Sequence, residues 1–300
     1  MIHGNAAAAA PAPANMPSRF ALHDPTRMPF RRSRSSAPRV DRARDDLRPP
    51  NALLMLLEGR APIELFSLIA ALPWLARLPR GDGHPVLVFP GMAASDITTL
   101  PLRRYLSSLG YVSQAWGQGL NFGPRPGVLE RSADDIRALA DKHGEPVSLI
   151  GWSLGGLYAR ELAKLHPTLT RCVVTLGTPF TGHPKATNAW RIYELLSRSK
   201  VDDAELMAAI RKPPPVPTTS IYSRSDGIVS WRCSLNDPGP QVENIEVPAS
   251  HVGMGTNPLA LYAVADRLAQ PIGQWRPFDV SGARRLFFRT ALPEAVATAG

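Results

Sequence analysis

Between residues 81 and 272 the chain alternates short, uniformly apolar runs with segments whose apolar positions repeat at helical spacing. A run that is apolar at every position is typical of a strand buried on both faces, and β-branched residues favour the same interpretation. The runs predict strands at 85–89, 111–116 (antiparallel or at an edge), 146–150, 171–176, 219–222 and 242–247, the last of the series. Helices are predicted at 99–109, 132–143, 154–165 and 258–268. This alternation predicts an α/β fold in which helices flank a mostly parallel central sheet.

The segment 132–143 has the clearest local helix signals. Ser132 is the predicted N-cap, and Asp135 follows three residues later, as in a capping box. Ala133, Ile136, Leu139 and Ala140 form one apolar face at helical spacing. Gly144 is expected to end this helix.

The stretch 178–217 has no strand signal, although it lies inside the α/β series. It holds two helix-like pieces, 189–197 and 203–210, and then the proline-rich 212–217. Insertions of this length usually cover a site, so we predict a helical lid here. The predicted organisation is a basic tail at 1–50, an amphipathic helical segment at 51–80, a domain at 81–272 and a C-terminal extension at 273–300.

The net charge of +9 is unevenly distributed along the 300 residues. Residues 1–50 hold nine Arg and four Asp in a sequence rich in Ala and Pro, and so contribute about half of the excess. Such a tail cannot bury enough apolar surface to offset its ordering entropy, which predicts a disordered leader. A basic tail alone does not indicate nucleic-acid binding, and no nucleic-acid partner is expected.

The most hydrophobic stretch runs from residue 53 to residue 78 and is interrupted by charged residues. Its longest charge-free part, 65–76, is shorter than the ~20 residues that cross a bilayer, so it predicts one or two amphipathic helices. Packing on the domain and peripheral contact with a membrane surface both remain open for this stretch. The first 20 residues lack the features of a secretory signal, so a cytoplasmic protein is expected.

No pattern in the chain indicates a cofactor or a metal. Metal-ligand spacings, phosphate-binding glycine loops and dinucleotide fingerprints are all missing from the sequence. Cys172 and Cys233 are too few for a disulfide framework, and whether they are bridged stays open. Cys172 lies in an apolar run, which is typical of a core thiol.

Gly151-Trp-Ser-Leu-Gly155 matches the pattern G-x-S-x-G directly between a predicted strand and a predicted helix. A strand, a tight turn and a helix are what this motif needs to hold a serine hydroxyl clear of the backbone. Glycines two positions either side of Ser153 remove side chains that would clash in such a turn. The motif in this context predicts that Ser153 is a nucleophile.

A serine nucleophile needs a base, and the base needs a carboxylate to orient it. His251 is the one histidine that follows Ser153 in a loop beyond the last predicted strand. Asp226 lies just beyond the strand 219–222 and is the predicted acid, with Asp237 as the fallback in the same long loop. The order Ser, Asp, His along the chain fits the arrangement that this motif accompanies.

A tetrahedral intermediate also needs backbone N–H groups that stabilise its oxyanion. We predict that Leu154, directly after the nucleophile, supplies one and that Met92 supplies the other, with Ala93 as the alternative. Trp152 and His183 are candidates for lining the substrate pocket, although ordinary packing or exposure explains each of them equally well.

Taken in order, the segments resemble the α/β-hydrolase superfamily, in particular its bacterial lipase/esterase-like branch. The resemblance covers about residues 83–270. It implies an α/β-hydrolase fold and cofactor-free hydrolysis of carboxylic or lipid esters through an acyl-serine intermediate. The segments that carry it are Pro90-Gly-Met92, Gly151-Trp-Ser-Leu-Gly-Gly156, Leu176-Gly-Thr-Pro179, Ser225-Asp-Gly-Ile-Val229 and Ser250-His-Val-Gly253.

Two other kinds of function remain open from the sequence. An acyltransferase would use the same triad with an alcohol in place of water. A thioesterase would use it to cleave a thioester in place of an ester. A non-catalytic hydrolase-like binding protein is the second alternative, but such proteins typically lose part of the triad, and this chain holds all three residues.

Overall fold

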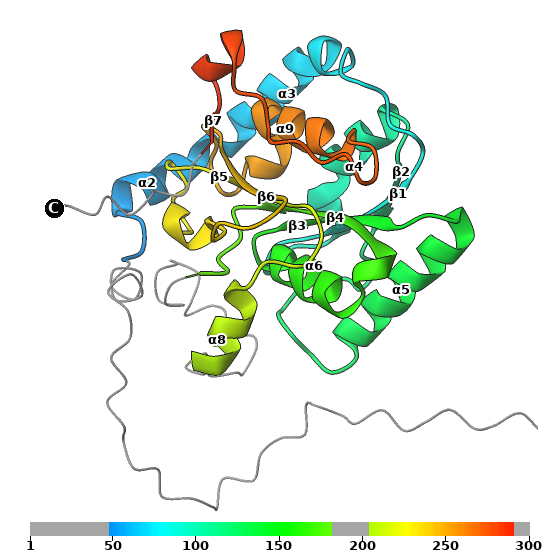
Figure 1. Ribbon diagram of the computed structural model, residues 1–300. Helices are drawn as coiled ribbons and strands as arrows, with labels where there is room; N and C mark the ends of the chain where they lie inside the picture. The colour runs from blue at the N-terminus through cyan, green and yellow to red at the C-terminus, as the bar shows by residue number, and fades with distance from the viewer. Residues whose placement is uncertain (1–47, 182–203, 291–300) are drawn as a thin grey trace, which may run out of the picture. The chain divides into compact units, whose positions relative to one another are not determined.

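The computed structural model describes residues 48–181 and 204–290. Its centre is a seven-stranded sheet with the order β2-β1-β3-β4-β5-β6-β7 (Figure 1). The first six strands pair in parallel, and only β6 and β7 pair antiparallel. The strands are β1 (Pro85–Phe89), β2 (Val112–Ala115), β3 (Val147–Trp152), β4 (Thr170–Leu176), β5 (Thr218–Tyr222), β6 (Val242–Glu246) and β7 (Arg289–Thr290).

Helices cover both faces of the sheet (Figure 1). The α-helices of the described residues are α2 (Ala52–Leu56), α3 (Ala61–Leu75), α4 (Asp96–Ser108), α5 (Val128–His143), α6 (Leu154–Leu165), α8 (Ala204–Arg211) and α9 (Pro258–Leu268), and the 3₁₀ turn η1 (Leu57–Arg60) joins α2 to α3. Helices α3, α4 and α9 lie together on one face of the sheet, and α5 and α6 lie on the other.

The uniform apolar character of the strands follows from this double cover. In β1, Val86 and Val88 enter the core beneath α4 and α9, whereas Leu87 and Phe89 enter the core beneath α5 and α6. All five residues of β1 are buried, as the pattern predicted. The predicted α/β fold with a mostly parallel sheet is confirmed.

Two helices begin earlier than predicted, and one strand was missed. Helix α4 begins at Asp96, not at residue 99. Helix α5 begins at Val128, not at Ser132, because buried Val128 extends its apolar face by one turn. The Ser132 hydroxyl therefore lies inside the helix, where it donates to the Val128 carbonyl at 2.9 Å and does not cap. Strand β6 is not the last, since the two-residue β7 of the C-terminal extension pairs with it.

Other boundaries agree with the sequence. The helices predicted at 154–165 and 258–268 are confirmed to the residue. Gly144 ends α5 with a φ of 70°, as predicted. Strand β2, predicted as antiparallel or at an edge, is an edge strand and is parallel to β1.

The hydrophobic stretch that begins at residue 53 forms α2, η1 and α3. In α3 only Glu64, Leu68 and Leu75 are buried, so most of its apolar side chains face away from the core. Within the described ranges, no helix combines the length and the hydropathy that a membrane crossing requires. His183 and most of the predicted lid lie outside the described residues, apart from α8 and the flanks of the insertion.

Candidate active site

The three predicted triad residues follow three strands at one edge of the sheet. Ser153 comes directly after β3, Asp226 follows β5, and His251 follows β6. Because β3 to β6 are parallel neighbours, their carboxyl ends meet at the same edge, where ligand sites of open α/β sheets lie. The fold thus brings residues that are up to 98 positions apart to one edge, since 251 − 153 = 98.

Ser153 adopts a strained backbone conformation, with φ 53° and ψ −122°. Its N–H donates to the Leu176 carbonyl at 2.8 Å, which anchors the turn to β4. The flanking glycines leave no room for side chains: a Cβ on Gly151 would lie 2.3 Å from the Gly156 Cα, and one on Gly155 would lie 2.4 Å from the Phe89 carbonyl oxygen. The sharp turn between β3 and α6 therefore depends on these glycines.

Replacing Gly155 with alanine is expected to destabilise the protein by about 3 kcal/mol, because the new methyl group meets backbone that cannot move aside. Gly59→Ala is a matched control, since nothing lies within 4 Å of that position, and its effect should stay within about 0.5 kcal/mol. Denaturant unfolding of both variants checks this. Equal stability of the two variants would contradict the turn geometry.

Asp226 and His251 form a buried pair. The Nδ1 of His251 lies 2.7 Å from the Oδ2 of Asp226, and both side chains are almost fully shielded from solvent. The other carboxylate oxygen accepts from the N–H groups of Ile228 at 2.9 Å and Val229 at 2.7 Å. With Nδ1 protonated toward Asp226, the Nε2 of His251 is left as the basic nitrogen.

Burial by itself would lower the pKa of His251, but the charge and the hydrogen bond of Asp226, together with the charge of Glu58, raise it above the ordinary value of 6.5. Protonated His251 has no basic nitrogen, so the form that is unable to act as a general base persists to a higher pH than for an ordinary histidine.

We expect kcat/KM for an uncharged ester to rise with pH around a midpoint above 6.5. A pH-stat titration with a neutral short-chain ester measures this without interference from the ionisation of a chromophore. A midpoint at or below 6.5 would mean that burial outweighs the two carboxylates.

Gly177 connects the serine side of the site to the acid–base pair. It directly follows Leu176, whose carbonyl binds the Ser153 N–H. Its φ is +57°, and a Cβ there would lie 3.1 Å from the His251 Nδ1 and 3.2 Å from the Asp226 Oδ2. The Ser153 backbone and the His251–Asp226 pair therefore lie against the same short segment.

The loop after β1 lies against the Ser153 turn. A Cβ on Gly91 would be 3.4 Å from the Ser153 Cβ. Within residues 48–181 and 204–290, no hydrogen-bond partner occurs for the N–H of Met92 or of Leu154, the first residue of α6. The N–H of Ala93, the alternative donor, is already bonded to the Asn121 carbonyl at 2.7 Å. The geometry therefore favours Met92 over Ala93.

Asn121 holds this loop and was not identified from the sequence. It is fully buried, and its side-chain amide donates to the Pro90 carbonyl at 2.8 Å. Its backbone N–H donates to the Ala94 carbonyl at 2.9 Å. A lone asparagine in a glycine-rich stretch carries no signal for this role, because its partners lie about 30 residues away along the chain.

Trp152, the pocket candidate, and Asp237, the fallback acid, form different contacts in the structure. Trp152 donates from Nε1 to the His251 carbonyl at 3.0 Å, so its indole supports the histidine backbone from the nucleophile side. Asp237 forms an ion pair with Arg211 at 2.7 Å, whereas Asp226 is the carboxylate that meets His251. The fallback acid therefore has a different partner.

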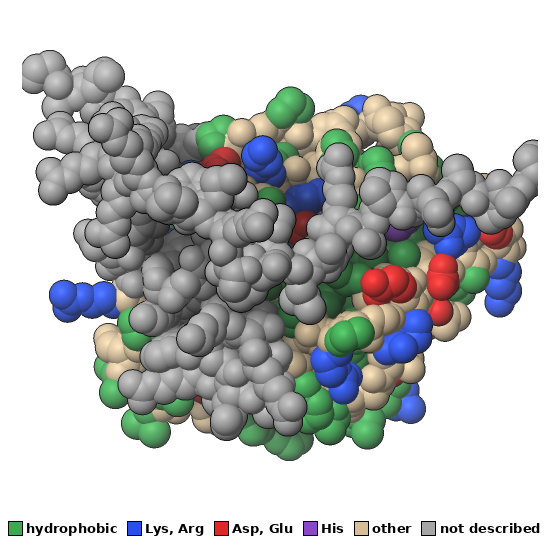
Figure 2. Space-filling view, turned by 90° about the horizontal axis from the view of Figure 1, so that it is seen from below, with side chains coloured by type: hydrophobic (Ala, Val, Ile, Leu, Met, Phe, Trp, Pro, Cys, Tyr) green, Lys and Arg blue, Asp and Glu red, His purple; other side chains and the backbone are tan. Residues whose placement is uncertain are grey.

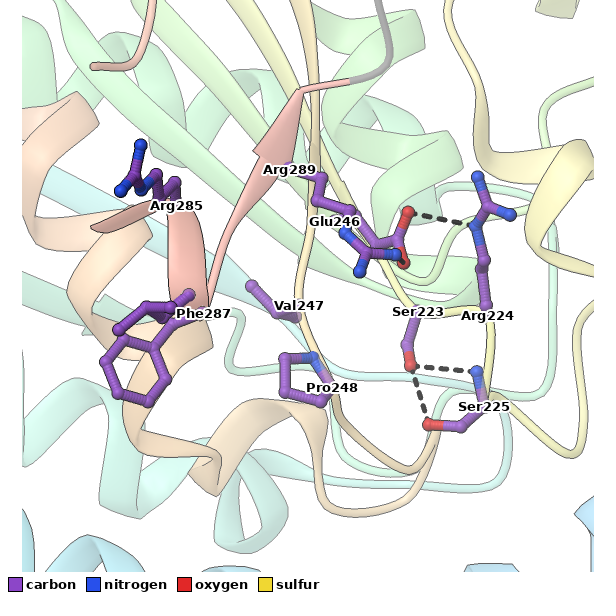
Figure 3. A pocket seen from close by; sticks show the side chains of 10 residues that line it. Ser223, Arg224, Ser225, Glu246, Val247, Pro248, Arg285, Phe287 and Arg289 are labelled. Atoms are coloured by element: carbon purple, nitrogen blue, oxygen red, sulfur yellow. Dashed lines mark hydrogen bonds and ion pairs between the residues drawn. The ribbon is translucent and has the colours of Figure 1, made fainter. Parts of the chain in front are cut away.

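Two serines tie the loop of Asp226 to the loop of His251. Figure 3 shows these two serines, Ser223 and Ser225, and the bonds between them. We call residues 223–229 the acid loop and residues 248–253 the histidine loop. The Ser223 hydroxyl accepts from the N–H groups of Ser225 and Ala249, each at 3.1 Å. The Ser225 hydroxyl donates to the Ala249 carbonyl at 3.1 Å. The two loops thus form one hydrogen-bonded unit.

A cavity of about 280 Å³ lies beside this unit, next to Glu246 and Arg289 (Figure 3). Arg224 forms an ion pair with Glu246 at 2.9 Å at its wall. None of the three triad residues lines this cavity. The cavity therefore lies beside the two loops but does not contain Ser153, Asp226 or His251.

The sequence profile of the Alpha/beta hydrolase family matches residues 86–295. Lipase B of Aspergillus fumigatus is 20% identical with a TM-score of 0.50, and the match covers 65% of this chain and 55% of the lipase. A structure from a study of LipS and LipT, two metagenome-derived lipolytic enzymes, is 14% identical with a TM-score of 0.51, over 64% of this chain and 95% of that one.

No curated protein matches the chain. At 20% and 14% identity, the likeness to the two solved structures shows the fold alone. The family profile, in contrast, covers well over half of the chain. The sheet order, the turn at Ser153 and the profile agree: the chain belongs to the alpha/beta hydrolase family.

Proposed function

We propose that this protein is a serine hydrolase that cleaves carboxylic esters with an apolar acyl group through an acyl-serine intermediate. The observation that carries the proposal is the buried 2.7 Å hydrogen bond between His251 and Asp226, at the sheet edge where the strained Ser153 turn lies. A buried imidazole–carboxylate pair of this kind is the orienting half of a serine triad.

In the first half of the proposed reaction, the Ser153 Oγ attacks the ester carbonyl carbon while the Nε2 of His251 takes the hydroxyl proton. The carbonyl oxygen becomes an oxyanion, which the N–H groups of Met92 and Leu154 stabilise. Asp226 stabilises the imidazolium. When the C–O bond of the ester breaks, the alcohol leaves with the proton from His251, and the acyl group stays on Ser153.

In the second half, His251 takes a proton from water, and the resulting hydroxide attacks the acyl carbon. The tetrahedral intermediate collapses, the carboxylic acid leaves, and the proton returns from His251 to the Ser153 oxygen. The N-terminus of α6 directly behind Ser153 adds a favourable field for the negative charge in both steps.

The test is hydrolysis of p-nitrophenyl esters of increasing acyl length, combined with mass spectrometry of the protein after reaction with a fluorophosphonate. The proposal expects turnover of these esters and a single adduct on the peptide that contains Ser153. The best acyl length separates a short-chain esterase from a lipase. Turnover without an adduct on Ser153 would contradict the proposal.

The fate of the acyl group provides the second readout. With an added alcohol in the assay, a hydrolase releases mainly the free acid, because water reaches the acyl-serine. A product dominated by the new ester would replace the hydrolase proposal with an acyltransferase that uses the same residues.

A further inference from the structure

The segment that precedes β1, formed by η1 and the start of α3, lies across the acid loop and the histidine loop. Within it Glu58 bonds both loops. Its Oε1 accepts from the N–H groups of Gly227 at 2.7 Å and His251 at 2.9 Å, and its Oε2 accepts from the N–H of Val252 at 2.8 Å. One carboxylate thus bonds the backbone beside the acid and the backbone of the histidine itself.

Arg60 and Glu64 extend the same contact. The Arg60 guanidinium donates from Nη2 to the Ser225 carbonyl at 3.0 Å and to the Ser225 hydroxyl at 2.8 Å. Glu64 accepts from the Ser250 N–H at 2.7 Å and from the Ser250 hydroxyl at 3.1 Å. Arg60 and Glu64 also form an ion pair at 3.2 Å, so the two loop contacts are joined. We call Glu58, Arg60 and Glu64 the clamp.

The orientation of the clamp is opposite to that of an ordinary surface helix. Residues 51–75 contain two carboxylates, Glu58 and Glu64, and both face the protein, while apolar side chains face outward. Burying a carboxylate costs free energy unless it gains charge-assisted hydrogen bonds, and these two carboxylates accept them from loop backbone. The loops in turn have no strand or helix of their own at Gly227 and Val252 to satisfy these N–H groups.

We propose that the clamp is a set of positioning residues that fixes the distance between Asp226 and His251. This inference rests on the proposed function. The clamp touches neither the substrate nor the reacting atoms; it acts through the backbone of the two loops, where small displacements strongly reduce the rate.

The charged groups around His251 support this role. Asp226 faces it from the acid loop, and Glu58 faces its backbone from η1. Glu64 lies one residue further away at Ser250, and its ion-pair partner Arg60 lies at Ser225 in the acid loop. The negative charge of Glu58 contributes to the raised pKa of His251. Removing that charge should therefore lower the pKa and move the acid limb of activity to lower pH.

The experiment compares Glu58→Gln, Glu58→Ala and Glu58→Asp with Glu130→Gln, a surface carboxylate in the first turn of α5. For Glu58→Ala we expect kcat to fall at least about tenfold with KM within about twofold, because the loss concerns the geometry of the reacting groups. Glu58→Gln should lose less kcat and shift the acid limb to lower pH. Glu58→Asp should restore part of the rate, and Glu130→Gln should change nothing.

Several outcomes would overturn the clamp. One is an unchanged kcat in Glu58→Ala. Another is a loss of kcat that only follows a lower folded fraction in thermal melts, with the acid limb unmoved in Glu58→Gln. If the wild type turns over no ester, the proposed function fails separately. The positioning role of the clamp is then tested by the downfield proton resonance of the His251 Nδ1–H. This resonance should weaken in Glu58→Ala and persist in Glu130→Gln.

A second observation concerns the opposite side of the same segment. The three most exposed large apolar residues of α3 lie at i, i+3 and i+6 on the side away from buried Leu68: Ile63 is 68% exposed, Phe66 70% and Ile69 58%. Helix α3 itself contributes no charged side chain to this side, since Glu64 is its only charged residue and faces inward. Figure 2 shows a different face, on which acidic and basic side chains are intermixed with scattered apolar ones.

The sequence on either side of α3 has an excess of arginine. Exposed Arg77 and Arg80 follow α3, and residues 1–50 before it hold nine Arg against four Asp. An apolar helix face flanked by arginines fits an anionic lipid surface, because the apolar side chains enter the interface while the cations meet the headgroups. We infer that this outer face of α3 docks on an anionic membrane, independently of whether the protein hydrolyses esters.

Vesicle flotation of the full chain tests the docking, with Ser153→Ala used throughout to prevent lipid turnover. Binding to phosphatidylglycerol-containing vesicles should exceed binding to phosphatidylcholine vesicles and weaken with salt. The double variant Phe66→Ser/Ile69→Ser should lower the partition at least tenfold. Leu165→Ser is the control, because Leu165 is 59% exposed at the end of α6.

Absence of vesicle binding would overturn the docking, as would an equal loss in the Leu165→Ser control. A third contrary outcome is a concentration-dependent dimer in ultracentrifugation that dissociates in the double variant while vesicle binding is unaffected. The face would then be an interface between two copies of the chain.

Discussion

Ser153→Ala is expected to lower kcat/KM for ester hydrolysis by about 10⁴- to 10⁶-fold, the loss that follows removal of a triad nucleophile. The Thr178 hydroxyl does not replace it, because that side chain lies against Gly156 and not at the end of β3. The residual rate would come from binding and from the oxyanion donors. The measurement is single-turnover and steady-state hydrolysis of the preferred p-nitrophenyl ester, with protein checked for contaminating activity.

The stability of two variants provides an internal control. Alanine keeps the strain of φ 53° and ψ −122°, whereas glycine adopts such a conformation freely. Ser153→Gly should therefore be as inactive as Ser153→Ala, yet more stable by about 1 kcal/mol, or about 2–4 °C in the melting temperature. Activity retained in either variant would contradict the assignment of the nucleophile, and equal melting temperatures would contradict the strain.

Elements that bury most of their residues could be predicted from the sequence alone. Strand β1 is buried at every position, and helices α6 and α9 bury most of theirs, so the pattern of apolar positions indicates where they lie. The start of α5 could not be predicted, because the Ser132 capping signal is outweighed by the burial of Val128 one turn earlier. Strand β7 has only two residues, too few to produce a pattern.

The residues of the site could likewise be predicted from the sequence only in part. Ser153 belongs to a local motif, and chain order then narrows the choice of acid and base. The contacts of Glu58 and Arg60 join residues between 165 and 194 positions apart, which no local pattern encodes. The interruption of an apolar stretch by two carboxylates was visible in the sequence, but only the fold shows that both face the acid and histidine loops.

Asp226→Asn is the second prediction with a large expected effect: kcat should fall about 10⁴-fold with little change in fold. The reason lies in the surroundings of the carboxylate. Its Oδ1 accepts from the N–H groups of Ile228 and Val229, so an asparagine would keep its carbonyl oxygen there. The amide nitrogen would then face the Nδ1 of His251 and donate to it, which forces the imidazole proton onto Nε2. In that tautomer His251 cannot accept the proton of Ser153.

Asp237→Asn is the matched control, because it removes the alternative carboxylate in the same long loop and weakens its contact with Arg211, without touching the bond between Asp226 and His251. Its kcat should stay within about threefold of the wild type, as for most surface changes away from a site. Asp226→Ala adds a further distinction, since it leaves the N–H groups of Ile228 and Val229 without their acceptor and should lower stability by about 1–3 kcal/mol as well as activity. A large loss in Asp237→Asn with a small one in Asp226→Asn would transfer the role of acid to Asp237. Large losses in both would mean that the loop between them, and not one carboxylate, orients His251.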